Sequence, residues 1–195
     1  TDEGVFTRIR FDRYHLSNVV GVPELPEVHE LIELPIGAMP RIEIIKSEAE
    51  YYQLSDHGVE NFIYPHQPSL SKSQDPSDIP FEWNESLYET DVFLSSELIS
   101  VEQKGTLRTI RLANLIIRPV DYNPQSGVLK VWKTITFKIH FDGADLTATD
   151  EMKKKYYSPY FESTYRQISN YQPLYERDDL VSYPVTYAII TNPIF

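Results

Sequence analysis

The sequence has no cysteine among its 195 residues. Without thiols the chain forms no disulfide, holds no thiolate-bound metal and supplies no cysteine nucleophile, so these three kinds of chemistry are excluded. Glycine is also scarce, at 7 residues, which excludes collagen-like chains and flexible linkers. No apolar run reaches the length of about 20 residues that a membrane-spanning helix needs, and we expect no membrane span.

Positive charge is in deficit as well, because 18 Lys and Arg face 29 Asp and Glu and give a net charge of −11. A nucleic-acid partner is not expected, since phosphate binding needs a basic surface. The acidity is interpreted as serving solubility, with pairing to a more basic partner domain as the alternative. Hydrophobic residues at 41% and aromatic residues at 13% indicate a globular chain rather than a disordered one.

Metal, cofactor and catalytic sites have no support in the sequence. The histidines lack the spacing of metal ligands, and no Gly-rich phosphate loop is present. We interpret all five as surface or hydrogen-bonded polar residues: His15, His29, His57, His66 and His140. We therefore expect no catalytic residue, no metal and no cofactor in this chain.

Alternation of apolar and polar residues is the main pattern before residue 145. It predicts short strands at residues 5–11, 30–34, 41–46, 50–54, 98–102 and 107–118. Lys104 and Gly105 predict a turn, and a slip in the alternation near Asn114 predicts a bulge. Segment 19–29, interrupted by glycine and proline, is predicted as a loop or a sheet edge.

The clearest strand signal is a β-hairpin at residues 121–141. Residues 121–127, DYNPQSG, are rich in turn formers. From residue 128 to residue 141 apolar side chains share one face, and only Lys133 breaks the alternation. Many short strands separated by Pro and Gly turns predict a mainly β chain built as an antiparallel β-sandwich.

Helical character is confined to the C-terminal part. Residues 151–156 predict a helical turn, and Ser158 followed by a proline predicts the start of a helix that ends near Asn170. Its apolar stripe is expected to consist of Phe161, Tyr165 and Ile168. Residues 172–184 are predicted as a linker and residues 185–190 as a fully buried strand.

The most distinctive segment is the proline-rich stretch at residues 65–80, PHQPSLSKSQDPSDIP. Proline fixes φ and pushes the preceding residue into extended conformation, so this segment is neither a helix nor a central strand. It is predicted to be a stiff, polar, exposed loop with one basic residue, Lys72. The cleft of a basic-specific protease accepts an extended segment of this kind, and stiffness limits the entropy lost on docking.

A series of motifs in order carries a resemblance to a known family: residues 21–26 (GVPELP), 34–38 (LPIGA), 66–73 (HQPSLSKS), 119–124 (PVDYNP) and 157–162 (YSPYFE). These motifs, with DP at 75–76 and IP at 79–80, resemble the N-terminal prodomain of gingipain-type cysteine peptidases, the C25 family. The resemblance is greatest to the lysine-specific members. It runs from residue 5 to residue 195.

The resemblance implies a jelly-roll-like β-sandwich prodomain at residues 1–145 and a helical part of the prodomain at 146–171. Residues 172–195 are expected to be a linker and the first strand of a peptidase domain, whose catalytic Cys and His lie outside this chain. The expected role is that of a propeptide that keeps a secreted cysteine endopeptidase latent and assists its folding. The family's link with type IX secretion implies transit through a periplasm to the cell surface or beyond.

By the same resemblance, Lys72 is the expected functional residue. Its ammonium is expected to meet an acidic group in the specificity pocket of the cognate peptidase, while Pro68, Ser71 and Ser73 dock in extended form. His66 is expected to help hold the shape of the loop. Lysine here implies a lysine-preferring enzyme, because lysine and arginine are not interchangeable in such a pocket. Since the segment resembles a substrate, slow cleavage after Lys72 is also expected.

The expected partner is the cognate peptidase domain, in cis before maturation and in trans afterwards. Members of the family are cut after a basic residue just ahead of the mature enzyme. The corresponding position here, near Asn170 and Tyr171, has no basic residue. Arg177 and Arg166 are the nearest candidates, and the lysines at 153–155 are a third.

Two other functions stay open. A carbohydrate-binding or adhesive β-sandwich would present exposed aromatic residues such as Trp83 and Trp132 in a row, and its binding would not depend on Lys72. A propeptide that acts only as a folding aid would not inhibit the mature enzyme.

Overall fold

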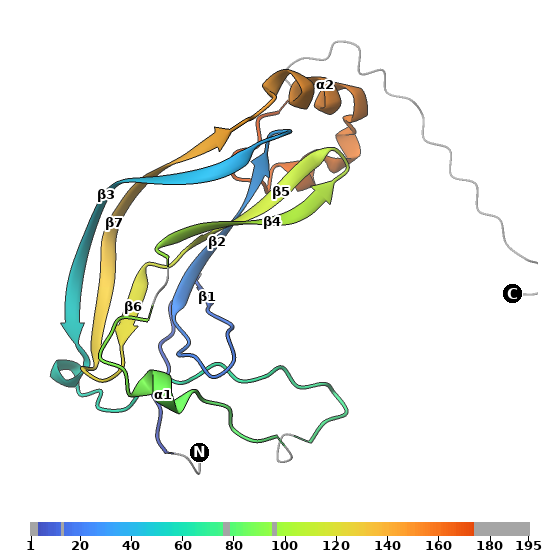
Figure 1. Ribbon diagram of the computed structural model, residues 1–195. Coiled ribbons are helices and arrows are strands. Elements are labelled where there is room, and N and C mark those ends of the chain that lie inside the picture. The colour runs from blue at the N-terminus through green and yellow to red at the C-terminus, as the bar shows by residue number, and fades with distance from the viewer. Residues whose placement is uncertain (1–3, 13, 76–78, 95–96, 174–195) are drawn as a thin grey trace, which may run out of the picture.

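The computed structural model describes residues 4–12, 14–75, 79–94 and 97–173. Its strands form two antiparallel sheets that make a curved sandwich (Figure 1). The four-stranded sheet has the order β1 (His15–Leu16), β2 (Pro26–Leu34), β5 (Ile110–Ile117), β4 (Ile99–Leu107). The three-stranded sheet has the order β3 (Met39–Gln53), β7 (Val128–Asp142), β6 (Val120–Asn123). The prediction of a mainly β chain with an antiparallel sandwich is confirmed.

Short helices lie at the two ends of the sandwich (Figure 1). They are η1 (Leu54–His57), α1 (Glu85–Tyr88), α2 (Leu146–Tyr156), η3 (Pro159–Phe161) and α3 (Glu162–Tyr165). In Figure 1 α2 stands at one end, and α1 stands at the other beside a long loop. None of the helices in the described part of the chain combines the length and apolar character needed to cross a membrane.

The core lies between the two sheets. Ile32 of β2 and Leu115 of β5 pack in one cluster with Phe137 and Ile139 of β7. Burial of an aliphatic side chain of this size contributes about 1.5–3 kcal/mol, so the contacts between the two sheets stabilise the fold. The alternation that predicted the 121–141 hairpin therefore points its apolar face at the other sheet.

β3 and β7 pair along nearly their whole length, and both contain irregularities. β3 is a single strand of 15 residues, where the sequence predicted two strands at 41–46 and 50–54. Its register with β7 shifts between Glu48 and Ala49, and Lys133 is the extra residue on β7 at this bulge. The bulge explains why Lys133 breaks the alternation of its strand.

The predicted strand at residues 5–11 is not formed. Only Thr7 makes an isolated parallel bridge, with Ile63. Phe6, which lies outside the alternating set of Val5, Ile9 and Phe11, packs into an aromatic cluster, with its ring 5.2 Å from that of Phe81 and 5.7 Å from that of Trp83. Val5 and Phe11 are exposed, so the alternation at residues 5–11 does not mark a buried face.

The predicted turn at Lys104 and Gly105 is wrong. β4 continues through both residues, and its pairing with β5 shifts register between Gln103 and Gly105. The glycine, with φ of +156°, occupies a bulge rather than a turn. The chain reverses at residues 108–109, where Arg108 takes a φ of +57°.

The predicted bulge near Asn114 is also absent, because β5 pairs with β2 without interruption from Arg111 to Ile117. Leu115 and Ile116 point to opposite faces of the sheet, and both are buried. A strand covered on both faces loses its alternation, which produced the slip in the pattern.

The C-terminal helical region differs from the prediction in its boundaries. α2 starts at Leu146, capped by the side chain of Asp145, which accepts a bond of 2.8 Å from the backbone N–H of Ala148. The helix predicted from Ser158 to Asn170 is instead a 3-10 turn followed by the single turn of α3. The predicted apolar stripe is found: Tyr165 and Ile168 are buried in a cluster that also contains Phe161. Predictions for residues 174–195 lie outside the described part of the chain.

Candidate functional site

The proline-rich loop is fixed to the body of the protein at its first residues. The carbonyl of His66 accepts a 2.9 Å bond from the N–H of Gly21, and the N–H of His66 donates a 2.9 Å bond to Val22. Nδ1 of His66 lies 3.0 Å from Oε1 of Glu24, and both side chains are mostly buried. These bonds tie the start of the loop to the body of the protein, and the role of His66 in holding the shape of the loop stays a prediction.

The two arms of the loop are joined by the side chain of Gln67. Its Nε2 donates a 2.7 Å bond to the carbonyl of Glu82, and its Oε1 accepts a 2.9 Å bond from the N–H of the same residue. One amide thus satisfies both backbone groups of Glu82, as a paired strand would. We refer to this pair of bonds as the clasp; it closes the loop at residues 68–81.

An aromatic cluster lies next to the clasp. The ring of Trp83, next to Glu82, lies 5.7 Å from Phe6 and 5.4 Å from Tyr88. Tyr88 is fully buried, and its hydroxyl donates a 2.7 Å bond to the carbonyl of Ile63. Burial raises the pKa of Tyr88 far above the ordinary tyrosine value, so the ring stays neutral. These contacts hold Trp83, and with it the neighbouring Glu82, in place at the base of the loop.

The tip of the loop is a tight turn at Ser71–Gln74. The N–H of Gln74 donates a 3.1 Å bond to the carbonyl of Ser71, and the side-chain Oε1 of Gln74 accepts a 2.8 Å bond from the N–H of Ser71. The hydroxyls of Ser71 and Ser73 lie 3.1 Å apart. The extended conformation expected for the whole segment is thus not found at the tip, because the prolines flank the tip rather than interrupt it.

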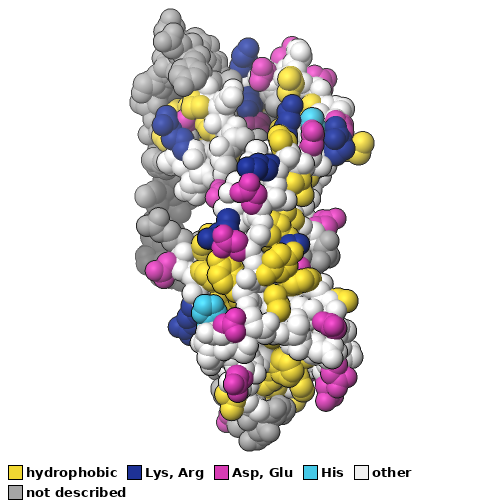
Figure 2. All heavy atoms as spheres, turned by 90° about the vertical axis from the view of Figure 1, so that its left-hand side faces the viewer, with side chains coloured by type: hydrophobic (Ala, Val, Ile, Leu, Met, Phe, Trp, Pro, Cys, Tyr) yellow, Lys and Arg dark blue, Asp and Glu magenta, His cyan; other side chains and the backbone are white. Residues whose placement is uncertain are grey.

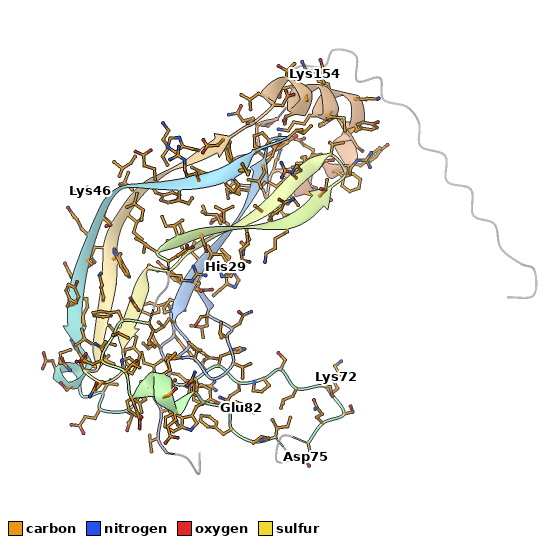
Figure 3. The ribbon with its side chains drawn as sticks, in the orientation of Figure 1. His29, Lys46, Lys72, Asp75, Glu82 and Lys154 are labelled. Atoms are coloured by element: carbon orange, nitrogen blue, oxygen red, sulfur yellow. The ribbon has the colours of Figure 1, made fainter. Side chains whose placement is uncertain are left out.

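Lys72 occupies the second position of this turn and is exposed. Its ammonium forms no ion pair with any carboxylate of the part of the chain that the structure describes. In Figure 3 Lys72 stands at the far end of the loop, away from both sheets, while Glu82 lies near the body. Pro68, on the arm that precedes Lys72, is half-buried. The single basic residue of the loop thus lies at its outer end.

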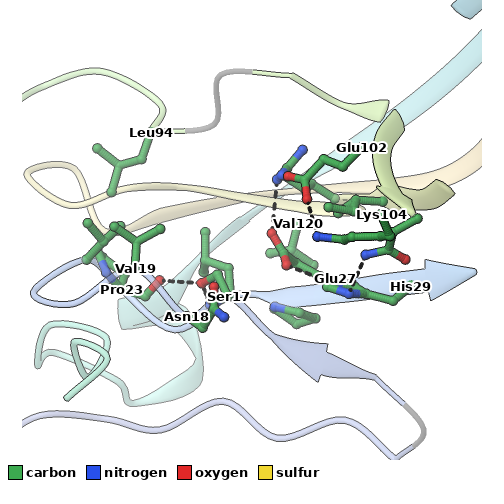
Figure 4. A pocket seen from close by; sticks show the side chains of 16 residues that line it. Ser17, Asn18, Val19, Pro23, Glu27, His29, Leu94, Glu102, Lys104 and Val120 are labelled. Atoms are coloured by element: carbon green, nitrogen blue, oxygen red, sulfur yellow. Dashed lines mark hydrogen bonds and ion pairs between the residues drawn. The ribbon is translucent and has the colours of Figure 1, made fainter. Parts of the chain in front are cut away.

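A pocket of about 500 Å³ lies on the outer face of the four-stranded sheet (Figure 4). At its floor the buried carboxylate of Glu27 lies 3.0 Å from Nε of Arg118 and 2.8 Å from Nε2 of His29. Asn114 Nδ2 donates a 3.1 Å bond to Nδ1 of His29, which places the histidine proton on Nε2, toward Glu27. Every strong polar group named here has a partner, which favours a structural network over a reactive one.

Sequence reasoning did not find this network. Its residues come from two segments far apart in the chain, 27–29 and 114–118. Segment 19–29 was predicted as a loop or a sheet edge, which hid that Glu27 and His29 share a face of β2. The ring of His15 lies 5.0 Å from that of His29, so two histidines meet here. No group of His, Asp and Glu side chains among the described residues is arranged to hold a metal ion.

The basic residues considered for processing lie in different settings. Arg166 is exposed, with Nε 3.1 Å from Oε1 of Glu162. The side chain of Lys153 is mostly buried in an ion pair of 2.6 Å with Glu33, and its backbone belongs to α2. Arg177 lies outside the described residues.

The two tryptophans named for a carbohydrate site lie in separate clusters of the described structure. Trp83 belongs to the cluster under the loop. Trp132 lies on the outer face of the β3–β7 pair, where Lys130 Nζ stands 4.6 Å from the Trp132 ring and 5.9 Å from those of Tyr51 and Phe93. Figure 2 shows hydrophobic side chains along the middle of this face with charged ones among them. The rings thus surround a lysine of the same chain.

Comparison with known proteins gives a family and a fold. The family model Propeptide_C25 matches residues 1–172. Lys-gingipain of Porphyromonas gingivalis is 36% identical over 195 residues, which is 100% of this chain and 11% of that protein. The chain thus spans about a tenth of the length of the Lys-gingipains it matches.

Two solved structures share the architecture. One concerns the zymogenic latency of gingipain K from Porphyromonas gingivalis; it has a TM-score of 0.67 and 38% identity and covers 74% of this chain and 79% of that one. The other is a complex of Porphyromonas gingivalis RgpB pro- and mature domains, with a TM-score of 0.62 and 19% identity, covering 80% of this chain and 81% of that one. The second shows likeness of fold alone.

Proposed function

The chain belongs to the C25 propeptide family, the non-catalytic prodomains of gingipain zymogens, and from this premise we propose that its loop blocks the cleft of a cognate cysteine peptidase. Lys72 enters the specificity pocket of that enzyme and its ammonium meets an acidic group there. The loop keeps the enzyme latent by barring substrate from the catalytic residues, which lie in the peptidase domain.

A single observation carries this proposal: the most projecting side chain of a braced loop is a cation without a carboxylate partner in the described residues. A lysine with only a solvation role would gain nothing from the clasp and the buried anchor behind it. A loop whose arms are already joined at Gln67 and Glu82 loses less conformational entropy on docking than a free chain. The ion pair is then formed inside the partner, where water is excluded.

Lysine at the tip favours a lysine-preferring partner. A pocket that fits a compact ammonium on a flexible stem differs from one that fits the planar fork of a guanidinium. The 36% identity to Lys-gingipain supports the same preference. The partner is the peptidase domain of the same precursor, bound in cis before maturation and in trans after it.

The other parts of the chain have supporting roles in this proposal. We assign residues 1–145 to the sandwich domain that carries the loop and residues 146–171 to the helical part. Tyr165 and Ile168 of the helical part pack on the four-stranded sheet. Assistance in folding and export by type IX secretion, through a periplasm to the cell surface or beyond, belong to the proposal through the family likeness.

The test is inhibition of a lysine-specific cysteine peptidase of this family by the 195-residue chain. We expect Lys72→Ala to weaken inhibition by roughly 2–5 kcal/mol, the cost of leaving the partner's buried charge unpaired. This corresponds to an increase of about 30-fold to several thousand-fold in the inhibition constant. Lys138→Ala, which removes an exposed lysine on β7, serves as the matched control and should inhibit like the unchanged chain.

The outcomes separate the competing functions. Equal inhibition constants for Lys72→Ala and the unchanged chain would refute the role of Lys72. No inhibition by the unchanged chain would favour a propeptide that acts only in folding. Retention of glycan binding by Lys72→Ala would favour the carbohydrate-binding alternative.

A further inference from the structure

We infer that Gln74 keeps the loop an inhibitor rather than a substrate, by holding the backbone beside Lys72 in a turn that slows cleavage by a protease. The inference rests on the proposed function, because it concerns the fate of the same loop in the peptidase cleft. The reaction in question is hydrolysis of the Lys72–Ser73 peptide bond. It consumes a water molecule and leaves a carboxylate on Lys72 and an amino group on Ser73.

The geometry of the tip gives Gln74 this role. Both backbone groups of Ser71 are engaged by Gln74: its N–H by the side-chain oxygen at 2.8 Å and its carbonyl by the backbone N–H at 3.1 Å. Ser71 directly precedes Lys72, so these are backbone groups next to the bond that would be cut. The turn leaves the lysine side chain pointing outward while its own backbone is folded.

A protease cleft binds a substrate as an extended strand, through main-chain hydrogen bonds on either side of the scissile bond. In the turn at Ser71–Gln74 the backbone groups of Ser71 are not available for such bonds. The side chain of Lys72 can fill the specificity pocket, but the Lys72–Ser73 bond is not aligned for attack, which requires close positioning of the reacting atoms. The loop can therefore bind through Lys72 while the Lys72–Ser73 bond is cut slowly.

Constraint elsewhere in the loop does not replace this contact. The clasp at Gln67 and Glu82 joins the arms at the base, and His66 anchors the first arm. Within the tip, the described bonds are those from Gln74 to Ser71 and the contact between the hydroxyls of Ser71 and Ser73. The side chain of Gln74 is therefore the element that a substitution can remove while the anchored base stays intact.

The first experiment uses trypsin, which cuts after lysine and arginine and needs no cognate partner. The 195-residue chain and its Gln74→Ala variant are digested briefly, and mass spectrometry follows cleavage of the Lys72–Ser73 bond. We expect Gln74→Ala to be cut roughly 3- to 10-fold faster at this bond, the effect of losing one hydrogen bond that holds the turn. Gln74→Glu retains an acceptor at this position and should be cut at nearly the original rate.

Two controls exclude a general loosening of the chain. Gln125→Ala removes an exposed glutamine from the turn between β6 and β7, and it should leave the rate at Lys72–Ser73 unchanged. Cleavage after the exposed Arg166 serves as an internal reference within each variant and should proceed equally in all of them. Equal rates at Lys72–Ser73 in Gln74→Ala and the unchanged chain would overturn the inference.

The second experiment uses the lysine-specific cysteine peptidase and records inhibition over time. We expect the unchanged chain to inhibit persistently, and Gln74→Ala to inhibit at first and then to release activity as Lys72–Ser73 is cut. If Gln74→Ala inhibits as durably as the unchanged chain and stays intact, the inference fails while the proposed function stands. If the unchanged chain does not inhibit, the proposed function fails, and the trypsin rates still decide whether Gln74 protects the bond.

Discussion

The ammonium of Lys153 lies 2.6 Å from the carboxylate of Glu33, and both side chains are nearly buried, with exposed fractions of 13% and 7%. This ion pair joins α2 to β2 and fixes the helical part of the chain to the outer side of the four-stranded sheet. The neighbouring Asn170 strengthens the junction, because its Oδ1 accepts a 2.7 Å bond from the N–H of Glu33. The C-terminal part is thus anchored to the strand by an ion pair and by a hydrogen bond from the backbone of Glu33 to the side chain of Asn170.

Removal of one member of this pair is expected to destabilise the protein strongly. Lys153→Ala leaves a buried carboxylate without its counter-charge, and the free energy of unfolding should fall by about 3–5 kcal/mol. Denaturant unfolding followed by circular dichroism measures the change. A double-mutant cycle with Glu33→Ala should recover part of the loss, and a strictly additive cycle would show that the two charges do not interact.

Alkaline pH is expected to weaken the fold through its buried tyrosines. Burial raises the pKa of Tyr88 and Tyr122 above the ordinary value of 10.0. Because the folded state keeps them neutral, their stabilisation is complete below the unfolded-state pKa of 10.0 and is lost as the pH rises above it. The unfolding free energy should therefore decline above pH 10, and it should decline less steeply in Tyr88→Phe.

The same variant tests the hydroxyl of Tyr88 at neutral pH. Tyr88→Phe leaves the carbonyl of Ile63 without its 2.7 Å donor, at a cost of about 1–3 kcal/mol. Tyr160→Phe provides the control, because Tyr160 is 69% exposed. Identical stability of Tyr88→Phe and Tyr160→Phe at neutral pH would show that the bond from Tyr88 to Ile63 does not stabilise the fold.

The clasp can be tested apart from the cation. Gln67→Ala removes both bonds to Glu82 and frees the arms of the loop, while Lys72 and Gln74 are untouched. We expect inhibition of the peptidase to weaken by about 10-fold, because the loop must then be ordered on docking. Denaturant unfolding should show a change of about 1 kcal/mol at most, since the site is exposed. Unchanged inhibition would mean that inhibition does not depend on the bonds between Gln67 and Glu82.

Much of the local structure follows from particular residues. The turn sequence 121–127 and the alternation after it predicted the β6–β7 hairpin, and the stripe of Tyr165 and Ile168 was found in the core. Errors arose where alternation had another cause. At residues 5–11 the alternation marks no buried face, because Val5 and Phe11 are exposed, and the pattern around Asn114 slips because β5 is buried on both faces.

The candidate site was predictable in part. The prolines and the single lysine identified the loop at residues 65–80, because these residue types constrain φ and charge locally. The turn at Ser71–Gln74 was missed, since a glutamine that bonds to a backbone three residues away is not a recognised turn former. The clasp by Gln67 was missed as well, because nothing local to Gln67 indicates that Glu82 will lie beside it.

By itself, the sequence determined the strand-rich class of this protein, its membership of a propeptide family, and the position of a lone cation in a proline-bounded loop. Each of these follows from residue types and from periodicity over short stretches of the chain. Only the tertiary structure decided which side chains meet: Glu27 with Arg118, Lys153 with Glu33, and Gln67 with Glu82. Such pairs depend on strand order and register, which arise from burial over the whole chain rather than from neighbouring residues.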